Sequence, residues 1–102
     1  MKVLTPGHRY ALAAFEGGQD QHIQFIEKVF APGQTDLTTL NDGTTNEEVL
    51  TMLIDRLTFL NTERMPGREN SIAITKLEEA LLWLNRRTAD RIQRGVEGTH
   101  KE

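Results

Sequence analysis

The chain has 102 residues, a formal net charge of −3 and no cysteine. The length predicts one domain over residues 1–102, of a size that is only marginally stable as a monomer. The lack of cysteine excludes disulfide scaffolds, thiolate catalysis and cysteine-based zinc sites. The acidic balance argues against general nucleic-acid binding. A hydrophobic fraction of 37% is low for a self-sufficient monomer and favours an oligomer.

No segment of the sequence fits a membrane span or a signal peptide. No apolar run approaches the ~20 residues that cross a bilayer. Pro6 and Gly7 interrupt the apolar stretch of residues 1–14, so this stretch lacks the core of a secretory signal. We therefore expect a cytoplasmic protein.

Residues 1–43 hold most of the glycines and a β-like pattern. Residues 9–15 fit a strand, and the glycine pair after it marks a turn because glycine tolerates positive φ. Residues 21–30 then alternate between apolar and polar side chains. These features predict a β-hairpin or a small antiparallel sheet with one face covered. A second turn and a short third strand are expected at residues 31–34 and 37–40.

Residues 44–94 carry helical patterning instead. Thr45 and Glu48 have the spacing of a capping box, and apolar residues then recur three and four positions apart. Pro66 ends this first helix, because proline cannot donate a hydrogen bond and disfavours helix at the residue before it.

A second helix is expected to begin near Asn70 or Ser71, either of which can cap it, and to run to about Arg94, before Gly95. The short link between the helices predicts antiparallel packing. The fold class is therefore α+β: an N-terminal β-hairpin or small antiparallel sheet followed by a two-helix antiparallel hairpin, in an oligomer. Residues 95–102 form a C-terminal tail without a strong structural signal.

The sequence shows no constellation of catalytic or metal-binding residues. The three histidines are far apart, and none has a metal-ligand partner at helical spacing. No glycine turn is followed by the Lys-Ser/Thr of a phosphate-binding loop. The adjacent carboxylates Glu47-Glu48 and Glu78-Glu79 are explained more simply as a helix start and a solvated face. We expect neither an enzyme nor a cofactor or metal site.

Positive charge is concentrated near the C-terminus. Residues 1–85 carry seven basic and twelve acidic side chains, whereas residues 86–94 carry four arginines and one aspartate. On a helix, Arg87, Arg91 and Arg94 share one face, and guanidinium groups bind phosphate bidentately. Arginines in this position also complement the helix dipole, but four of them exceed that need. We therefore predict an anion site.

Residues near the link between the helices fit a nucleotide site. Phe59 lies at the edge of the apolar face, where its ring can stack on a base, although contact with a partner helix explains it equally well. Asn70 can hydrogen-bond a ligand, although capping explains it more simply. Arg68 is unremarkable in a monomer, but in a threefold assembly three copies would converge on an anion. Trp83 is expected in the core or an interface.

Residues 53–61, Pro66 and residues 68–84 resemble the hairpin domain shared by two phage sponge families. These families are the Thoeris anti-defence sponges and the anti-CBASS cyclic-nucleotide sponges. The continuation at 87–91 and the tail at 95–100 are more similar to the Thoeris branch. The β-like first half also favours that branch, because the anti-CBASS branch is essentially all-helical.

The resemblance implies a protein that binds signalling nucleotides of bacterial immune enzymes and holds them without cleavage in the cytoplasm of the infected host. In the Thoeris branch the ligand is a glycocyclic ADP-ribose, bound between protomers. Phe59 is similar to the ring that stacks on adenine, and Asn70 to a polar contact beside it. Arg87 and Arg91 match a pair that reaches the ligand from the neighbouring subunit.

The resemblance also implies further contacts and a larger assembly. Some members are hexamers that bind cyclic trinucleotides at a separate site on a threefold axis. For this chain we expect a hexamer built as a trimer of dimers, with cyclic di- or trinucleotides as further ligands. Arg68 is the residue that we place there. Phe15 and Arg9 are candidate contacts from the N-terminal segment, which varies within the family.

The spacing of these residues along the second helix constrains the pocket. Asn70 and Arg87 are about 25 Å apart along one helix at 1.5 Å per residue. The pocket must therefore combine the turn end of one subunit with the arginine end of another. Two alternatives remain: a non-enzymatic protein-interaction module built on an α-hairpin dimer, and a weak hydrolase of the same ligands, for which we find no general base.

Overall fold

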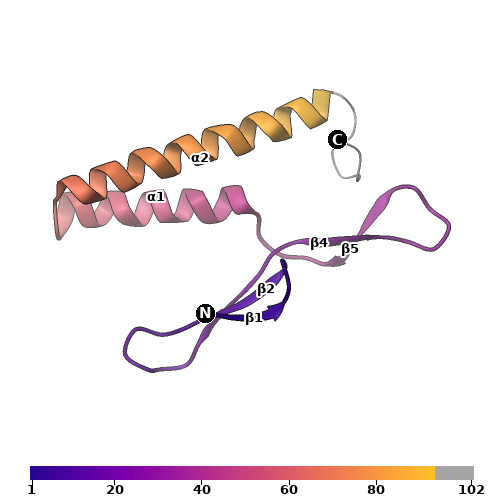
Figure 1. The fold of residues 1–102 in the computed structure, drawn as a ribbon, viewed down its shortest axis with the longest axis horizontal. Coiled ribbons are helices and arrows are strands. Elements are labelled where there is room, and N and C mark those ends of the chain that lie inside the picture. Colours follow the sequence, from indigo (N-terminus) through magenta and orange to yellow (C-terminus); the bar gives the residue numbers. More distant parts are fainter. Residues whose placement is uncertain (94–102) are drawn as a thin grey trace. The chain divides into compact units, whose positions relative to one another are not determined.

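The computed structural model describes residues 1–93, which divide into two compact units. The first unit is Met1–Thr45 and holds all the strands, and the second begins at Asn46 and holds both helices. This arrangement of antiparallel strands followed by two helices confirms the predicted α+β class (Figure 1). The expectation of a single domain over residues 1–102 stays a prediction. Arg94, Gly95 and the tail lie outside the described residues.

The first unit contains two small antiparallel sheets. Strands β1 (Lys2–Thr5), β2 (Arg9–Leu12) and β3 (Gln21–Gln24) form the first sheet, in that order. Strands β4 (Glu27–Phe30) and β5 (Leu37–Asn41) form the second. The turn at residues 31–34 is confirmed, since Gln34 N donates to the Ala31 carbonyl at 3.0 Å. The short third strand is confirmed as β5, one residue longer than predicted.

The predicted strand over residues 21–30 is wrong as a single element. The chain changes partners at its middle: Phe25 N donates to the His8 carbonyl at 2.7 Å, and Ile26 N donates to the Thr44 carbonyl at 2.9 Å. The segment is therefore split into β3 and β4, in different sheets. The adjacent apolar residues Phe25 and Ile26 interrupt the alternation at the break, but such a pair does not reveal which neighbour each residue will bond to. The strand expected at 9–15 ends at Leu12, and β1 was not predicted.

Gly43 lies where the chain returns alongside the end of β3. Thr44 forms a parallel bridge with Phe25, and Thr44 N donates to the Gln24 carbonyl at 2.9 Å. A Cβ at Gly43 would lie 2.7 Å from the carbonyl carbon of Phe25 and closer still to the Gln24 oxygen. Only glycine fits this approach of two backbones without a shift.

The second unit is a pair of antiparallel helices, α1 (Asn46–Glu63) and α2 (Arg68–Gln93), which lie side by side in Figure 1. Helix α1 begins directly after Thr45, the predicted cap. Near this end, Thr88 of α2 donates to the Glu47 carboxylate at 3.1 Å. The half-buried positions of α2 recur at three- and four-residue spacing and are Asn70, Ala73, Ile74, Leu77, Leu81, Leu84, Thr88 and Arg91. We call this row the seam.

The helices cover only their facing sides. Neither helix has a buried residue. Within the described part of the chain the only buried apolar residue is Ala11, at 3% exposure. Trp83 is 58% exposed, so the expectation that it lies in the core of the protomer is wrong, whereas an interface position stays a prediction.

The start of α2 differs from prediction. The helix begins at Arg68, two residues before Asn70, and Ser71 N donates to the Gly67 carbonyl at 3.3 Å. Asn70 and Ser71 are therefore not its caps. Asn61 of α1 supplies the capping contact instead. Its Oδ1 accepts from Gly67 N at 2.9 Å, and its Nδ2 donates to Ser71 Oγ at 3.1 Å. This satisfies a backbone donor that a helix start otherwise leaves open.

Substitution of Gly43 by alanine tests the backbone crossing. Gly43→Ala must displace backbone atoms, and we expect it to lower the free energy of unfolding by about 2 kcal/mol or more. Gly18→Ala is the matched control, because a Cβ there meets only Ala14 Cβ at 3.6 Å. Urea unfolding followed by circular dichroism measures both. Equal stability of the two variants would contradict the crowding of Gly43.

Removal of the Asn61 side chain tests the turn between the helices. Asn61→Ala leaves Gly67 N without its acceptor, and we expect a loss of about 1–2 kcal/mol in unfolding free energy despite the better helix propensity of alanine. Thr62→Ala, at the exposed neighbouring position, should be neutral or slightly stabilising. The same unfolding measurement compares them, and an Asn61→Ala protein as stable as Thr62→Ala would refute the role of this side chain.

Candidate ligand-binding site

Phe59 presents its ring at the turn end of the helix pair. Its neighbours Leu57 and Leu60 are half-buried against α2, whereas Phe59 is 49% exposed. The guanidinium carbon of Arg64 lies 5.7 Å from the centre of the ring. This cation–π contact supports the ring from one side. The structure thus places Phe59 outside the contact between the helices, as the sequence predicted, with surface available for stacking.

Asn70 lies in the first turn of α2, and its side-chain amide is held in a defined orientation. Its Nδ2 donates to the Met65 carbonyl at 2.7 Å. A carbonyl oxygen can only accept, so this bond fixes which end of the amide is nitrogen. The Oδ1 is then the group left to meet a ligand, and it recognises donors such as hydroxyl or amino groups.

Arg68 begins α2 and is exposed. It shares a shallow hollow with a second cation, Lys76, and with Ser71, Ile72 and Thr75. The two hydroxyl groups already donate to backbone carbonyls, Ser71 to Gly67 and Thr75 to Ser71, so it is the two positive charges that favour an anion here. From the sequence, Arg68 was the one residue predicted at an anion site, and Lys76 was not predicted there. The helical spacing of the two cations, i and i+8, was the available signal.

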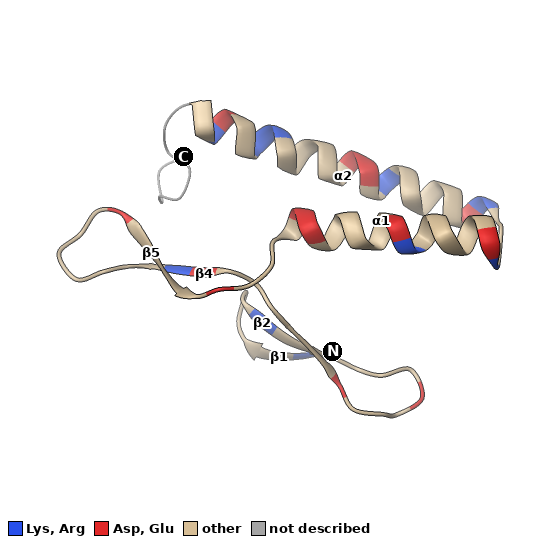
Figure 2. Ribbon diagram, turned by 180° about the vertical axis from the view of Figure 1, so that it is seen from behind, with Lys and Arg blue, Asp and Glu red and all other residues tan. Residues whose placement is uncertain are grey.

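The arginine-rich segment lies at the opposite end of α2, where basic residues are blue in Figure 2. Arg87 is exposed, and Arg91 is half-buried in the seam. Arg86 lies over the Trp83 ring at 5.4 Å from its centre. Arg87 and Arg91 are four residues apart on one helix and so lie on neighbouring turns. Arg94, the third arginine predicted for this face, lies outside the described residues.

The two ends do not meet within one protomer. Phe59 and Asn70 lie at the turn, and Arg87 lies about 25 Å away along α2. Figure 1 shows the helices running together over their common length, with the turn at one end only. The structure therefore brings Phe59, Asn70 and Arg68 to one end and Arg87 and Arg91 to the other.

Phe15 and Arg9 belong to the strand unit. Phe15 lies in the loop between β2 and β3, and its side chain is fully exposed. Arg9 lies on β2, and its Nη2 donates to His22 Nδ1 of β3 at 3.0 Å. The structure does not place these two residues in a common cluster.

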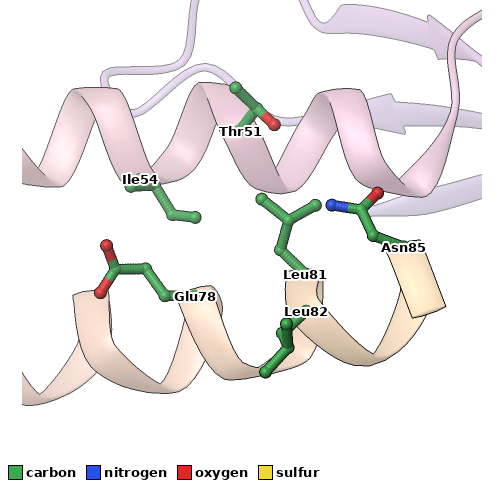
Figure 3. Close-up of a pocket in the computed structure, with 6 residues that line it drawn as sticks. All are labelled: Thr51, Ile54, Glu78, Leu81, Leu82 and Asn85. Atoms are coloured by element: carbon green, nitrogen blue, oxygen red, sulfur yellow. The ribbon is translucent and has the colours of Figure 1, made fainter.

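A groove runs between the helices away from both ends. Thr51 and Ile54 of α1 line it on one side. Glu78, Leu81, Leu82 and Asn85 of α2 line the other side, and Figure 3 shows Glu78, Leu81 and Asn85 extending toward α1. The lining is largely apolar and holds no cation. It is therefore a poor complement to phosphate, and the sequence argument did not single it out as a site.

Residues 1–93 show neither a metal-binding cluster nor a membrane-spanning helix. In this part of the chain no group of three or more histidines, aspartates or glutamates is placed to hold a metal ion. No helix there is long and apolar enough to cross a bilayer.

The sequence matches a known protein family. The model of the Acb2/Tad1 hairpin domain matches residues 22–89. "Thoeris anti-defense 1" of Bacillus phage SBSphiJ7 is 56% identical over 61 residues, which cover 60% of this chain and 43% of that protein. The chain thus spans less than half the length of this curated relative. The family match covers β3 to α2, including Phe59, Arg68, Asn70 and Arg87. Because it extends over more than half of the sequence and both helices of the hairpin, the chain belongs to the Acb2/Tad1 hairpin-domain family.

Proposed function

We propose that the protein is a phage anti-defence sponge, which binds immune signalling nucleotides in the cytoplasm of the infected host and holds them without cleavage. The observation that carries this proposal is the set of Phe59, Asn70 and Arg87 inside the family-matched hairpin. The name of the relative from Bacillus phage SBSphiJ7 points to defence by the Thoeris system as the target.

The chemistry of these side chains fits an ADP-ribose derivative. A ring such as that of Phe59 stacks on adenine. The Oδ1 of Asn70 accepts from a ribose hydroxyl or from the adenine amino group. The paired guanidinium groups of Arg87 and Arg91 match a pyrophosphate. Glycocyclic ADP-ribose offers all three partners and is our proposed ligand.

Arg68 and Lys76 suit a second ligand class. Their hollow lies on the first turns of α2 and holds two cations. Cyclic di- and trinucleotides carry several phosphates around a ring, and copies of Arg68 brought together by threefold symmetry would meet them. Binding of this class would extend the target from Thoeris to CBASS signalling.

Oligomerisation follows from the separation of the two ends. A small ligand cannot bridge about 25 Å, so the pocket needs the turn end of one protomer and the arginine end of another. The exposed faces of the helices support an assembly, because Met52, Leu82 and Trp83 are each more than half exposed. We propose a homodimer as the binding unit and a hexamer, a trimer of dimers, as the complete particle.

Capture requires no catalytic group. Binding energy from stacking, hydrogen bonds and charge pairing suffices to hold a nucleotide, and the groups named above supply these interactions. A non-enzymatic protein-interaction module is the second candidate. The exposed apolar side chains on the outer faces of α1 and α2 favour it, and it requires no arginine.

Ligand release after heat denaturation tests the sponge directly. Protein mixed with glycocyclic ADP-ribose should return the intact nucleotide when heated. We expect Arg87→Ala and Arg91→Ala each to weaken binding by roughly tenfold or more, because a charge-assisted bond to phosphate is lost. Calorimetry measures the affinity, and Arg56→Ala, an exposed arginine of α1, is the matched control.

The outcomes of that experiment separate the candidates. No heat and no released ligand across cyclic ADP-ribose isomers and cyclic oligonucleotides would refute the sponge. Release of a cleaved nucleotide would identify a hydrolase. An interaction module predicts that the arginine variants act as wild type and that Leu82→Ser or Trp83→Ser removes activity.

Mixing two inactive variants tests the composite pocket. Phe59→Ala and Arg87→Ala should each bind poorly alone. In a co-expressed mixture, a dimer with one copy of each has one pocket with both residues intact. Random pairing therefore restores about a quarter of the wild-type sites. Calorimetric stoichiometry measures this fraction, and no recovery in verified mixed dimers would show that each pocket lies within one protomer.

A further inference from the structure

The three-stranded sheet has an unusual charge composition for this chain. The whole sequence carries 15 acidic and 12 Lys or Arg residues. Strands β1, β2 and β3 nevertheless contain no Asp or Glu. Their titratable basic side chains are Lys2, Arg9 and His22, one on each strand, and the basic segment of β2 is blue in Figure 2.

The strand register puts all three basic side chains on one face. Lys2 of β1 and His22 of β3 are both paired with Ala11 of β2, so the three form a row across the sheet. Arg9 is two residues before Ala11 and therefore points to the same face. We call Lys2, Arg9 and His22 the basic face.

The opposite face of the same sheet is apolar. Val3, Tyr10 and Ile23 form its corresponding row, and the Tyr10 ring meets the Phe25 ring edge-on at 5.9 Å between centroids. The ring contact of the sheet is made on the apolar face, whereas the buried residue Ala11 belongs to the basic row. Lys2, Arg9 and His22 are all exposed.

The contact between Arg9 and His22 prepares donors for an anion. A guanidinium can only donate, so the 3.0 Å contact from Arg9 Nη2 makes His22 Nδ1 an acceptor. The neutral imidazole then carries its proton on Nε2, which is a second donor. Ala11 lies between His22 and Lys2 in the row and is buried at 3% exposure, so an anion on this face meets the exposed side chains around Ala11 and not Ala11 itself.

The spacing of these groups selects the size of the anion. Lys2 and His22 are two strands apart, about 9–10 Å between backbones, while Arg9 touches His22. We propose that the basic face binds a phosphate-bearing anion of the diphosphate class, with Arg9 and His22 holding one phosphate and Lys2 the other. This site uses none of Phe59, Asn70, Arg87 and Arg91, so it does not rest on the proposed function. Arg9, which the resemblance offered as a contact for the sponge ligand, is assigned here to the sheet instead.

One carboxylate borders the face and bears on the ligand. Asp20 and Gln19 line a hollow together with His22. A carboxylate repels phosphate but accepts bonds from hydroxyl groups. A sugar attached to the diphosphate would meet Asp20, whereas inorganic pyrophosphate would not. The two sources of the diphosphate are thus distinguishable.

Nuclear magnetic resonance on the full-length chain tests the site. Inorganic pyrophosphate and ADP-ribose are titrated separately into labelled protein. We expect saturable shifts of the Arg9 Nε and His22 ring signals at one common Kd, with the His8 ring unmoved. Arg9→Gln and His22→Thr should each raise that Kd by roughly tenfold. Tighter binding of ADP-ribose assigns a sugar diphosphate, and equal binding assigns the free anion.

Two controls make the result decisive. Lys28→Gln removes an exposed cation from β4 of the other sheet and should leave the Kd unchanged. The Arg87→Ala/Arg91→Ala protein should still show the Arg9 and His22 shifts, which separates this site from the helix site. If Arg9→Gln does not fold, judged by the loss of the Tyr10 signals, Arg9→Lys replaces it with a several-fold expected loss. Equal effects of Lys28→Gln and the Arg9 variants, or shifts confined to the arginines of α2, would overturn the proposal.

Discussion

An isolated pair of antiparallel helices can cover only one side of each helix, and this constraint governs the hairpin unit. The seam of α2 is half-buried along its length, and no residue of either helix is buried. Side chains beside the seam, such as Phe59 and Trp83, therefore stay exposed. The linear pairing also separates the turn from the far end by the full length of the shorter helix. Exposed aromatic rings and distant arginines are thus two results of the same packing.

The helices were predictable because their patterns are local. Apolar residues at three- and four-residue spacing mark the facing sides of both helices, and Pro66 follows shortly after the last residue of α1, Glu63. The start of α2 was not predictable in this way. Asn70 looks like a cap in sequence, but Asn61 of the other helix satisfies Gly67 N, and Asn70 instead donates to Met65. A cap supplied by a residue six positions upstream leaves no signature at the helix start itself.

The strands were harder to predict, because their partners are chosen by distant residues. The adjacent apolar residues Phe25 and Ile26 interrupt the alternation of residues 21–30, but only their bonds to different neighbours show that one sheet ends there. The candidate sites differ in the same way: residues on the helices could be placed from the sequence, and residues on the strands could not. The positions of Phe59 and Arg87 on their helices came from spacing alone. The basic face did not, since Lys2, Arg9 and His22 come together only through a strand register that the sequence leaves open.

The three-four spacing of the seam also limits how this protein can diverge. Each residue inserted into α2 rotates everything beyond it by about 100° and advances it by 1.5 Å. A single insertion would turn Arg87 and Arg91 away from their present sides and place polar residues against α1. Seven residues restore the facing sides nearly in full and move the arginines by about 10 Å. The length of α2 can therefore change in evolution only in steps of about seven residues if the helix is to keep the same side against α1.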